Sequence, residues 1–180
     1  MPIAVAPTDA PSRPAPLPPE VLADIATGIA TAEAWWRPHA HHDPDGRRPV
    51  RLLATEAYEV WVIGWTKGQG VPLHDHGEST GAIAVVEGRL TERTVEAGRL
   101  VETGLGAGTV RRLPADRVHE VANDEDEHAT SIHVYSPPLS TMRSYEPSSR
   151  WPVAVEHVEH EPAVFAVDAV TLLAHPSSRG

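Results

Sequence analysis

The chain has 180 residues, the size of one ordinary domain, and this length is enough to bury a hydrophobic core. Its 25 acidic and 15 basic side chains give a formal net charge of -10, which argues against a surface that grips the phosphates of nucleic acid. Cysteine is absent, so disulfides, thiolate metal sites and a cysteine nucleophile are excluded.

The chain has no segment typical of a membrane protein or of a secreted one. No apolar run approaches the roughly 20 residues that a membrane-spanning helix needs. The N-terminal segment MPIAVAPTDAPSRPAPLPPE lacks the charged start and the compact apolar block of a secretory signal. We therefore expect a cytoplasmic protein with no membrane partner.

The N-terminal part divides into an arm and a helix. Residues 1–17 are rich in proline and poor in large apolar side chains, so we expect a flexible arm. From Pro18 the segment predicts a helix, with Glu20 favourably placed at its start and with apolar residues at helical spacing, namely Val21, Leu22, Ile25, Ile29 and Ala32. The predicted domain covers residues 18–160, and residues 161–180 form a tail in which FAVDAVTLLAHPSSRG favours a short helix.

After Pro49 the hydrophobic pattern changes to a period of two. Short segments rich in Val, Ile and Thr are separated by Gly, Pro, Asp or Asn: YEVWVIGW, GAIAVVEGRLTERTVE, GTVRRLP, RVHEVAN, ATSIHVYSPP and PVAVEHVEH. Many short strands at close spacing predict an antiparallel sandwich or barrel. The expected fold class is therefore mainly β, with one N-terminal helix.

Two groups of histidines are candidates for metal binding. His39, His41 and His42 lie in RPHAHHDPDGRRP, whose Asp-Pro-Asp-Gly sequence is typical of a turn, so a solvated loop is the favoured interpretation and a metal site is the alternative. His74 and His76 differ, because residues two apart on a strand point to the same face. Both imidazoles can then meet a divalent ion inside a barrel, with a third ligand from another strand.

The segment around this pair resembles the first motif of the cupin superfamily. Five residues separate Gly68 from His74, and six separate Gly81 from Gly88. The motif has a glutamate where this chain has Gly81. The resemblance implies a double-stranded β-helix, or jelly-roll, barrel in a single domain.

A second segment, GTVRRLPADRVHEVAN, resembles the second cupin motif. It matches from Gly108 through Pro114 and His119 to Asn123, with Asp116 in place of the motif's inner glycine. The resemblance implies that His119 lies beside His74 and His76 and is the third metal ligand. Three histidines without the glutamate leave the full charge of a ferrous ion and open positions, which suit a thiolate and dioxygen.

The run SIHVYSPPL makes the resemblance more specific, because it is similar to a run of the thiol dioxygenases, of which cysteine dioxygenase is a member. In that family the run supplies a hydrogen-bonded relay beside an Fe(II) ion held by three histidines. The resemblance implies that Ser131, His133 and Tyr135 form the relay here. These residues lie two apart and share one face of a strand. His133 is also the alternative to His119 as third ligand.

The substrate contact is expected to be an arginine. Cysteine-type members of the family bind the substrate carboxylate with an arginine that precedes the first long strand, and Arg51 lies there in this chain. Guanidinium and carboxylate form a bidentate pair. Mercaptopropionate-type members carry a second arginine after the Ser-Pro-Pro run, where this chain has Met142 followed by Arg143.

The resemblance thus implies an Fe(II)-dependent thiol dioxygenase, whose partners are a small thiol and O2. Cysteine is the first-choice substrate, and 3-mercaptopropionate, mercaptosuccinate and ergothioneine are alternatives. A cupin of another class, such as a metal-dependent isomerase, is a rival hypothesis. A non-catalytic metal-binding sensor is the other rival.

Overall fold

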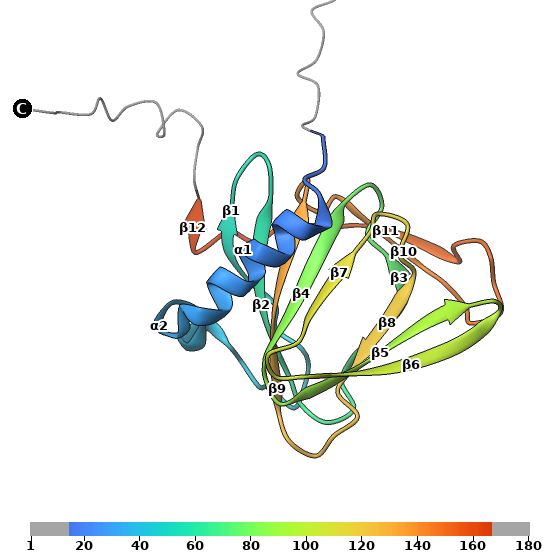
Figure 1. Ribbon diagram of the computed structural model, residues 1–180, viewed down its shortest axis with the longest axis horizontal. Helices are drawn as coiled ribbons and strands as arrows, with labels where there is room; N and C mark the ends of the chain where they lie inside the picture. The colour runs from blue at the N-terminus through green and yellow to red at the C-terminus, as the bar shows by residue number, and fades with distance from the viewer. Residues whose placement is uncertain (1–14, 167–180) are drawn as a thin grey trace, which may run out of the picture.

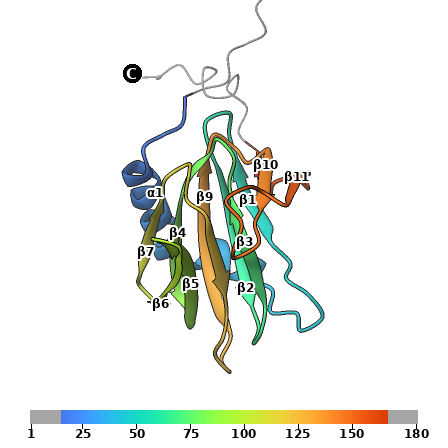
Figure 2. The same cartoon turned by 90° about the vertical axis from the view of Figure 1, so that its right-hand side faces the viewer.

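The computed structural model describes residues 15–166 and has two six-stranded sheets with a helix on the outside (Figure 1). The strand order is β12-β1-β2-β9-β4-β7 in the first sheet and β11-β10-β3-β8-β5-β6 in the second. Within these residues the strand pairs are antiparallel, except that β1 and β12 are parallel. Figure 2 shows strands of both sheets running in roughly the same direction, with the helix at one side.

The bounds of the elements are as follows. The first sheet consists of β1 (Val50–Ala54), β2 (Glu59–Trp65), β4 (Thr80–Glu87), β7 (Val110–Leu113), β9 (Ala129–Ser136) and β12 (Phe165–Ala166). The second sheet consists of β3 (Gly70–Asp75), β5 (Arg89–Glu96), β6 (Arg99–Gly106), β8 (His119–Ala122), β10 (Thr141–Ser144) and β11 (Ala154–His157). The helices are α1 (Pro19–Thr31), the short α2 (Glu33–Trp36) and a 3-10 turn (Arg37–His39).

Helix α1 covers the outer face of the first sheet, against β4, β7 and β9. Proline at its first position needs no hydrogen-bond partner, and Glu20 lies in its first turn, where the helix dipole favours a negative charge. The side chains of Leu22 and Ala26 are completely buried. They pack with Ile132 and Val134 of β9 in a core cluster outside the sheet.

Strand β9 is buried on both faces, and this decides which side chains reach the interior. All eight of its residues are buried. Ile132 and Val134 face the helix, so the alternating residues Ser131, His133 and Tyr135 face the space between the sheets. A second core cluster fills that space with side chains of both sheets, including Ile63, Ile83, Leu90, Leu113 and Val121.

The predicted fold class is confirmed: the protein is mainly β, with an N-terminal helix and the two-sheet arrangement of a double-stranded β-helix. The sequence did not indicate β6, β10 and β12, which lie at or next to sheet edges. β6 and β12 are edge strands with one partner each, and β10 pairs with the edge strand β11 and has no fully buried residue, so none of the three needs a regular apolar alternation.

The structure does not test the predictions for most of the two ends of the chain. Most of the arm at residues 1–17 and most of the tail at residues 161–180 lie outside the described residues, as does most of the helix expected in the tail. At the inner end of the arm, Leu17 N–H donates to Ser136 Oγ at 3.0 Å. Within residues 15–166 no helix is long and apolar enough to span a membrane. The domain boundaries and the cytoplasmic location stay predictions.

Candidate metal centre and cavity

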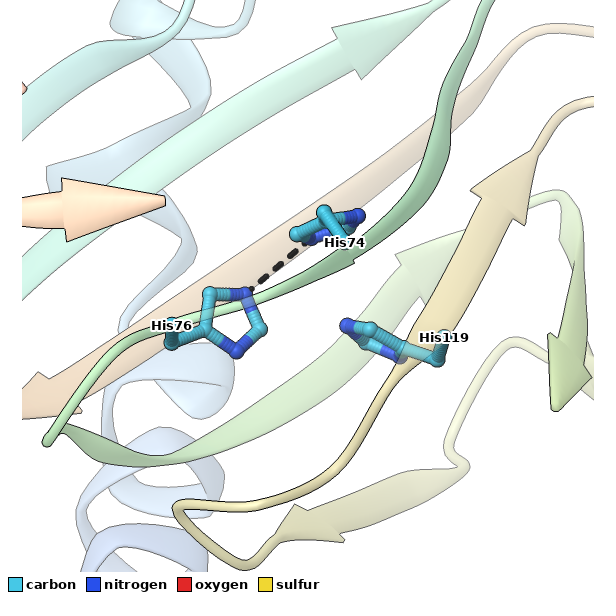
Figure 3. A group of neighbouring side chains, drawn as sticks. All are labelled: His74, His76 and His119. Atoms are coloured by element: carbon cyan, nitrogen blue, oxygen red, sulfur yellow. Dashed lines mark hydrogen bonds between the residues drawn. The ribbon is translucent and has the colours of Figure 1, made fainter. Parts of the chain in front are cut away.

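Three histidines meet where β3 pairs with β8. His74 lies directly opposite His119 in the register of the two strands, and His76 follows His74 just past the end of β3. One ring nitrogen from each of the three lies within 4.8 Å of the others. Figure 3 shows the three rings converging, and all three side chains are buried. The structure thus brings together the three residues that the motifs indicated.

The nitrogens have the hydrogen-bond pattern of a metal site. His74 Nδ1 donates to the carbonyl of Pro72 at 2.8 Å, so its Nε2 carries a lone pair. That Nε2 lies 3.2 Å from His76 Nε2, the contact dashed in Figure 3. His119 Nε2 is buried without a hydrogen-bond partner among the described residues. Buried acceptors are rarely left unsatisfied, and a divalent ion bound by these nitrogens would satisfy them.

The electrostatics favour the neutral form that metal binding requires. Burial lowers the pKa of His74 to about 3, and neighbouring His119 contributes. Burial also lowers the pKa of His76 well below its ordinary value, with His74 and His119 adding to the effect. Imidazole binds metals only when neutral, so no proton has to leave these two rings at neutral pH.

A buried carboxylate holds the other nitrogen of His119. His119 Nδ1 lies 3.0 Å from Glu92 Oε1, and both side chains are almost fully buried. Glu92 Oε2 lies within ion-pair distance of Arg111 and Arg117. Burial disfavours the charge of Glu92, but the hydrogen bond to His119 and the two arginines hold its pKa below the ordinary value. The carboxylate is therefore ionised at neutral pH and accepts a hydrogen bond from His119.

A second chain of polar groups runs along the inner face of β9. Trp65 Nε1–H donates to Ser131 Oγ at 2.8 Å, Ser131 Oγ lies 2.8 Å from His133 Nε2, and His133 Nδ1 lies 2.9 Å from Tyr135 OH. Indole N–H can only donate. With Ser131 donating to His133 Nε2, His133 Nδ1–H donates to the Tyr135 oxygen, and the tyrosine hydroxyl hydrogen is the one left to point into the cavity; in the other tautomer of His133 that hydrogen is donated to Nδ1.

The protonation states of His133 and Tyr135 follow from the burial of their side chains. Desolvation lowers the pKa of His133 to about 3 and raises that of Tyr135 well above its ordinary value. His133 is therefore neutral and Tyr135 is protonated at neutral pH. The hydrogen-bonded chain therefore ends in a neutral tyrosine hydroxyl, and the rings of Tyr135 and His76 lie 4.7 Å apart.

Tyr135 also explains the glycine that replaces the motif's glutamate. Gly81 lies opposite Tyr135 where β4 pairs with β9. A Cβ atom at residue 81 would lie 2.9 Å from Cδ1 of the Tyr135 ring and 3.1 Å from the carbonyl oxygen of Val134. Any side chain at this residue would therefore require Tyr135 to move. Glycine leaves the space to the tyrosine ring.

A cavity of about 360 Å³ joins the two polar groups, a volume within the usual range for small-molecule sites. Most of its wall is apolar or aromatic, and the wall includes the following residues: Pro49, Trp61, Ile63, Trp65, Val71, Val121, Leu139, Met142 and Val158. The polar and charged residues that line it are His74, His119, His133, Tyr135, Arg47, Glu159 and Glu161. Such a cavity excludes water from a bound molecule while the polar groups fix its orientation.

Arg47 is a cavity residue that the sequence did not single out. Its guanidinium lies 5.0 Å from the ring centroid of Trp65, and no carboxylate of residues 15–166 lies within ion-pair distance of it. Burial lowers its pKa, yet an arginine stays charged at neutral pH. No sequence signal distinguishes Arg47 from its neighbour Arg48, which pairs with Asp43 at 2.6 Å.

The two arginines that the sequence did favour lie elsewhere. Arg51 Nη1 lies 3.3 Å from the buried carboxylate of Glu59, and its Nη2 donates to the carbonyl of Glu161 at 2.7 Å. Arg143 Nε donates to Asp75 Oδ1 at 2.9 Å. Neither arginine lines the cavity, whereas Arg47 does. A protein carboxylate lies within ion-pair distance of Arg51, and the role of Arg51 as substrate contact stays a prediction.

The histidines of the N-terminal loop do not join the centre. His42 Nε2 lies 3.1 Å from the carbonyl of Ala129, and its ring stacks on His128 with centroids 4.9 Å apart. Within residues 15–166, the group of side chains placed to hold a metal ion is His74, His76 and His119.

Comparison with known proteins gives a family and a fold. A family model described as cysteine dioxygenase type I matches residues 19–148. Cysteine dioxygenase type 1 of Danio rerio is 26% identical over 116 residues, which cover 57% of this chain and 58% of that protein. The chain thus matches less than two thirds of that relative's length.

Solved structures of low sequence identity share the fold. A protein of Thermus thermophilus is 22% identical, with a TM-score of 0.51 over 57% of this chain and 93% of that chain. A protein of Klebsiella pneumoniae with a double-stranded β-helix domain is 20% identical, with a TM-score of 0.50 over 56% of this chain and 85% of that chain. At these identities the comparison concerns the fold alone.

The contact between Gly81 and Tyr135 predicts the effect of Gly81→Ala. The added methyl group lies too close to the tyrosine ring, so we expect the free energy of unfolding to fall by about 1 to 3 kcal/mol, as in other overpacked cores. Urea denaturation of the metal-free protein measures the change. Gly106→Ala is the matched control, because nothing lies within 4 Å of a Cβ there. Equal stabilities of the two variants would contradict the predicted crowding.

Proposed function

The chain belongs to the cysteine dioxygenase type I family, and we propose that it is an iron(II)-dependent thiol dioxygenase. The proposed reaction adds both atoms of one O2 to the sulfur of a thiol, so that R–SH and O2 give the sulfinic acid R–SO2H with no other reactant. The observation that carries the proposal is one cavity lined both by histidines of a metal-type cluster and by the hydroxyl end of a buried Ser, His, Tyr chain.

His74, His76 and His119 would hold the iron through the nitrogens that face one another. When bound, ferrous iron supplies open coordination positions and the redox capacity that a reaction between a thiol and dioxygen needs. The three ligands are neutral, so the protein leaves the ion's positive charge available to an anionic thiolate. This donor set fits a thiol better than a substrate that binds only through neutral oxygen atoms.

The relay residues position a proton donor at the reacting end of the cavity. Tyr135 stays protonated, and in the tautomer that the proposal requires His133 accepts from Ser131 and donates to the tyrosine oxygen, which orients that hydroxyl. The hydroxyl hydrogen can then bond to an oxygen or sulfur atom near the histidines. The apolar wall keeps bulk water away and holds the two reactants near each other.

The substrate proposal is a small thiol that carries a carboxylate, with cysteine as the first choice. Arg47 is better placed than Arg51 to bind the carboxylate, because it lines the cavity and has no carboxylate partner in the described part of the chain. Trp61 Nε1–H is a second donor without a partner on the cavity wall among the described residues. 3-Mercaptopropionate, mercaptosuccinate and ergothioneine remain alternatives, since each carries a sulfur atom and a carboxylate.

Two other functions for the same centre are a metal-dependent isomerase and a non-catalytic metal-binding sensor. Neither gives a reason for the buried chain from Trp65 to Tyr135, whose hydroxyl end lies beside the histidines. Burying three polar side chains has a cost in desolvation that their mutual hydrogen bonds offset. A sensor would need only the metal ligands and the cavity.

An oxygen-electrode screen of the iron-loaded protein tests the proposed reaction. We expect about one iron per chain, and oxygen uptake with at least one carboxylated thiol that is matched by sulfinate in the mass spectrum. His119→Ala should lose iron and oxygen uptake together, because it removes one of the three ligands. His157→Ala, at an exposed histidine of β11, is the control and should retain both. Iron retained at full stoichiometry in His119→Ala would identify another third ligand.

The second test concerns the relay. Tyr135→Phe removes the hydroxyl and keeps the ring that packs beside Gly81 and His76. We expect it to bind iron like wild type and to lose roughly 10- to 1000-fold in kcat, which is about 1.4 to 4 kcal/mol of barrier. Steady-state sulfinate formation measures the loss. Unchanged kcat would make Tyr135 a packing residue.

The third test separates the three arginines. In Arg47→Gln we expect binding of 3-mercaptopropionate to weaken by about 2 to 3 kcal/mol, because charge-assisted hydrogen bonds to the carboxylate are lost. Binding of 3-mercaptopropanol, its neutral counterpart, should change little. Trp61 and Trp65 line the cavity, so tryptophan fluorescence without oxygen reports binding.

Arg48→Gln makes the same change of charge one residue away, at an exposed side chain that pairs with Asp43. It should leave both thiols unaffected. A loss of carboxylate preference in Arg51→Gln rather than in Arg47→Gln would return the substrate contact to Arg51.

A further inference from the structure

We propose that Glu92 is a positioning residue of the metal centre, which fixes the ring of His119 and places a negative charge behind it. The inference rests on the proposed metal site, and it concerns a residue that does not touch the metal or the substrate. Glu92 lies on β5, and β8 separates that strand from β3, which leads into the other two histidines. Its carboxylate meets the ring nitrogen of His119 that faces away from the cluster.

The sheet register explains how Glu92 reaches His119. His119 lies opposite Thr94 where β8 pairs with β5, and Val121 lies opposite Glu92. Residues two apart on a strand share a face, so Glu92 and His119 are diagonal neighbours on the inner face of this sheet. Their atoms Oε1 and Nδ1 are 3.0 Å apart, and the side chains are 0% and 1% exposed. Water therefore does not compete for this hydrogen bond.

The charge of Glu92 decides the tautomer of His119. An ionised carboxylate only accepts hydrogen bonds, so His119 must carry its proton on Nδ1. Its Nε2 then has a lone pair, and this is the buried atom that has no partner in the described part of the chain. Arg111 and Arg117 lie within ion-pair distance of the second oxygen of Glu92, so two cations balance the negative charge of the buried carboxylate.

His119 and His74 differ in their outer contacts. His74 Nδ1 donates to a neutral backbone carbonyl, whereas His119 Nδ1 donates to a carboxylate. A negative acceptor raises the basicity of the ligand and strengthens its bond to the metal. Gly81 removes the carboxylate that the first motif would place at the metal, and Glu92 supplies one behind a ligand. The centre thereby gains a negative charge without losing an open coordination position.

The alternative role for Glu92 is an ion pair that only supports the fold. It contacts Arg111 of β7 and Arg117 of the segment before β8, so it links parts of both sheets. The two roles differ in what a neutral substitute changes. Loss of a purely structural ion pair lowers the stability of the metal-free and metal-loaded forms equally. Loss of a positioning residue weakens the metal site itself.

The variant Glu92→Gln keeps the size of the side chain and removes its charge. We expect the dissociation constant for Co(II), measured by chelator competition, to rise about 10- to 100-fold, the usual effect of changing the outer partner of a ligand histidine. Co(II) should raise the melting temperature of Glu92→Gln less than that of wild type when both proteins are measured at the same Co(II) concentration, because stabilisation by a ligand depends on its affinity. The Fe(III)/Fe(II) potential should become more positive.

Glu102→Gln is the matched control. Glu102 lies on the neighbouring strand β6 and pairs with Arg93 at 3.0 Å, with a side chain that is 63% exposed. It should leave the Co(II) affinity and the potential at wild-type values. Glu92→Asp keeps the charge on a shorter side chain and should recover part of the affinity lost in Glu92→Gln.

Two outcomes would overturn the inference. Equal Co(II) affinity in wild type and Glu92→Gln, with both forms of the variant destabilised alike, would reduce Glu92 to a structural ion pair. Failure of wild type to bind Co(II) or Fe(II) would overturn the proposed metal site, and the inference with it. The first outcome leaves the proposed thiol dioxygenase function intact, so the two failures are distinguishable.

Discussion

Burial of neutral imidazoles between two sheets is the constraint on which the rest of the site depends. His74 and His76 lie in a desolvated space that lowers their pKa, and the buried Nε2 of His119 has no hydrogen-bond partner among the described residues, which is costly. The Pro72 carbonyl fixes the orientation of the His74 ring through its Nδ1, and the Glu92 carboxylate fixes that of the His119 ring in the same way. The inward nitrogens are left to one another and to a metal ion.

The same constraint governs the inner face of β9. Alternation along a strand buried on both sides sends Ser131, His133 and Tyr135 into the apolar interior, where each must find a hydrogen-bond partner. They find one another, and Trp65 closes the far end of the chain. The tyrosine ring also takes the space next to Gly81. The lost glutamate and the buried relay are therefore two consequences of one packing arrangement.

The arginines near the cavity differ in whether a described carboxylate lies within ion-pair distance of them. Arg51, Arg111 and Arg143 each face a buried or nearly buried carboxylate, on Glu59, Glu92 and Asp75 respectively. Arg47 faces the cavity and the ring of Trp65 instead. Arg47, which has no carboxylate within ion-pair distance in residues 15–166, is therefore the arginine that we propose as the contact for an anionic ligand, whereas the paired arginines link the strands that carry the site.

The sequence by itself determined the fold class, the N-terminal helix and the three histidines. The fold class and the helix follow from local periodicity, whereas the grouping of His119 with His74 and His76 came from the resemblance to the two cupin motifs and not from the spacing alone. It also indicated the relay, because residues two apart on one strand must share a face.

Only the tertiary structure decided which arginine faces the cavity and which carboxylate stands behind His119. Arg47, Arg48 and Arg51 look alike in the chain, and their roles depend on carboxylates that folding brings close. Glu92 looks like one more charge on a strand until β5 and β8 pair and bury it. Edge strands such as β6 were missed for a related reason, since a strand with one partner and an exposed surface needs no apolar alternation.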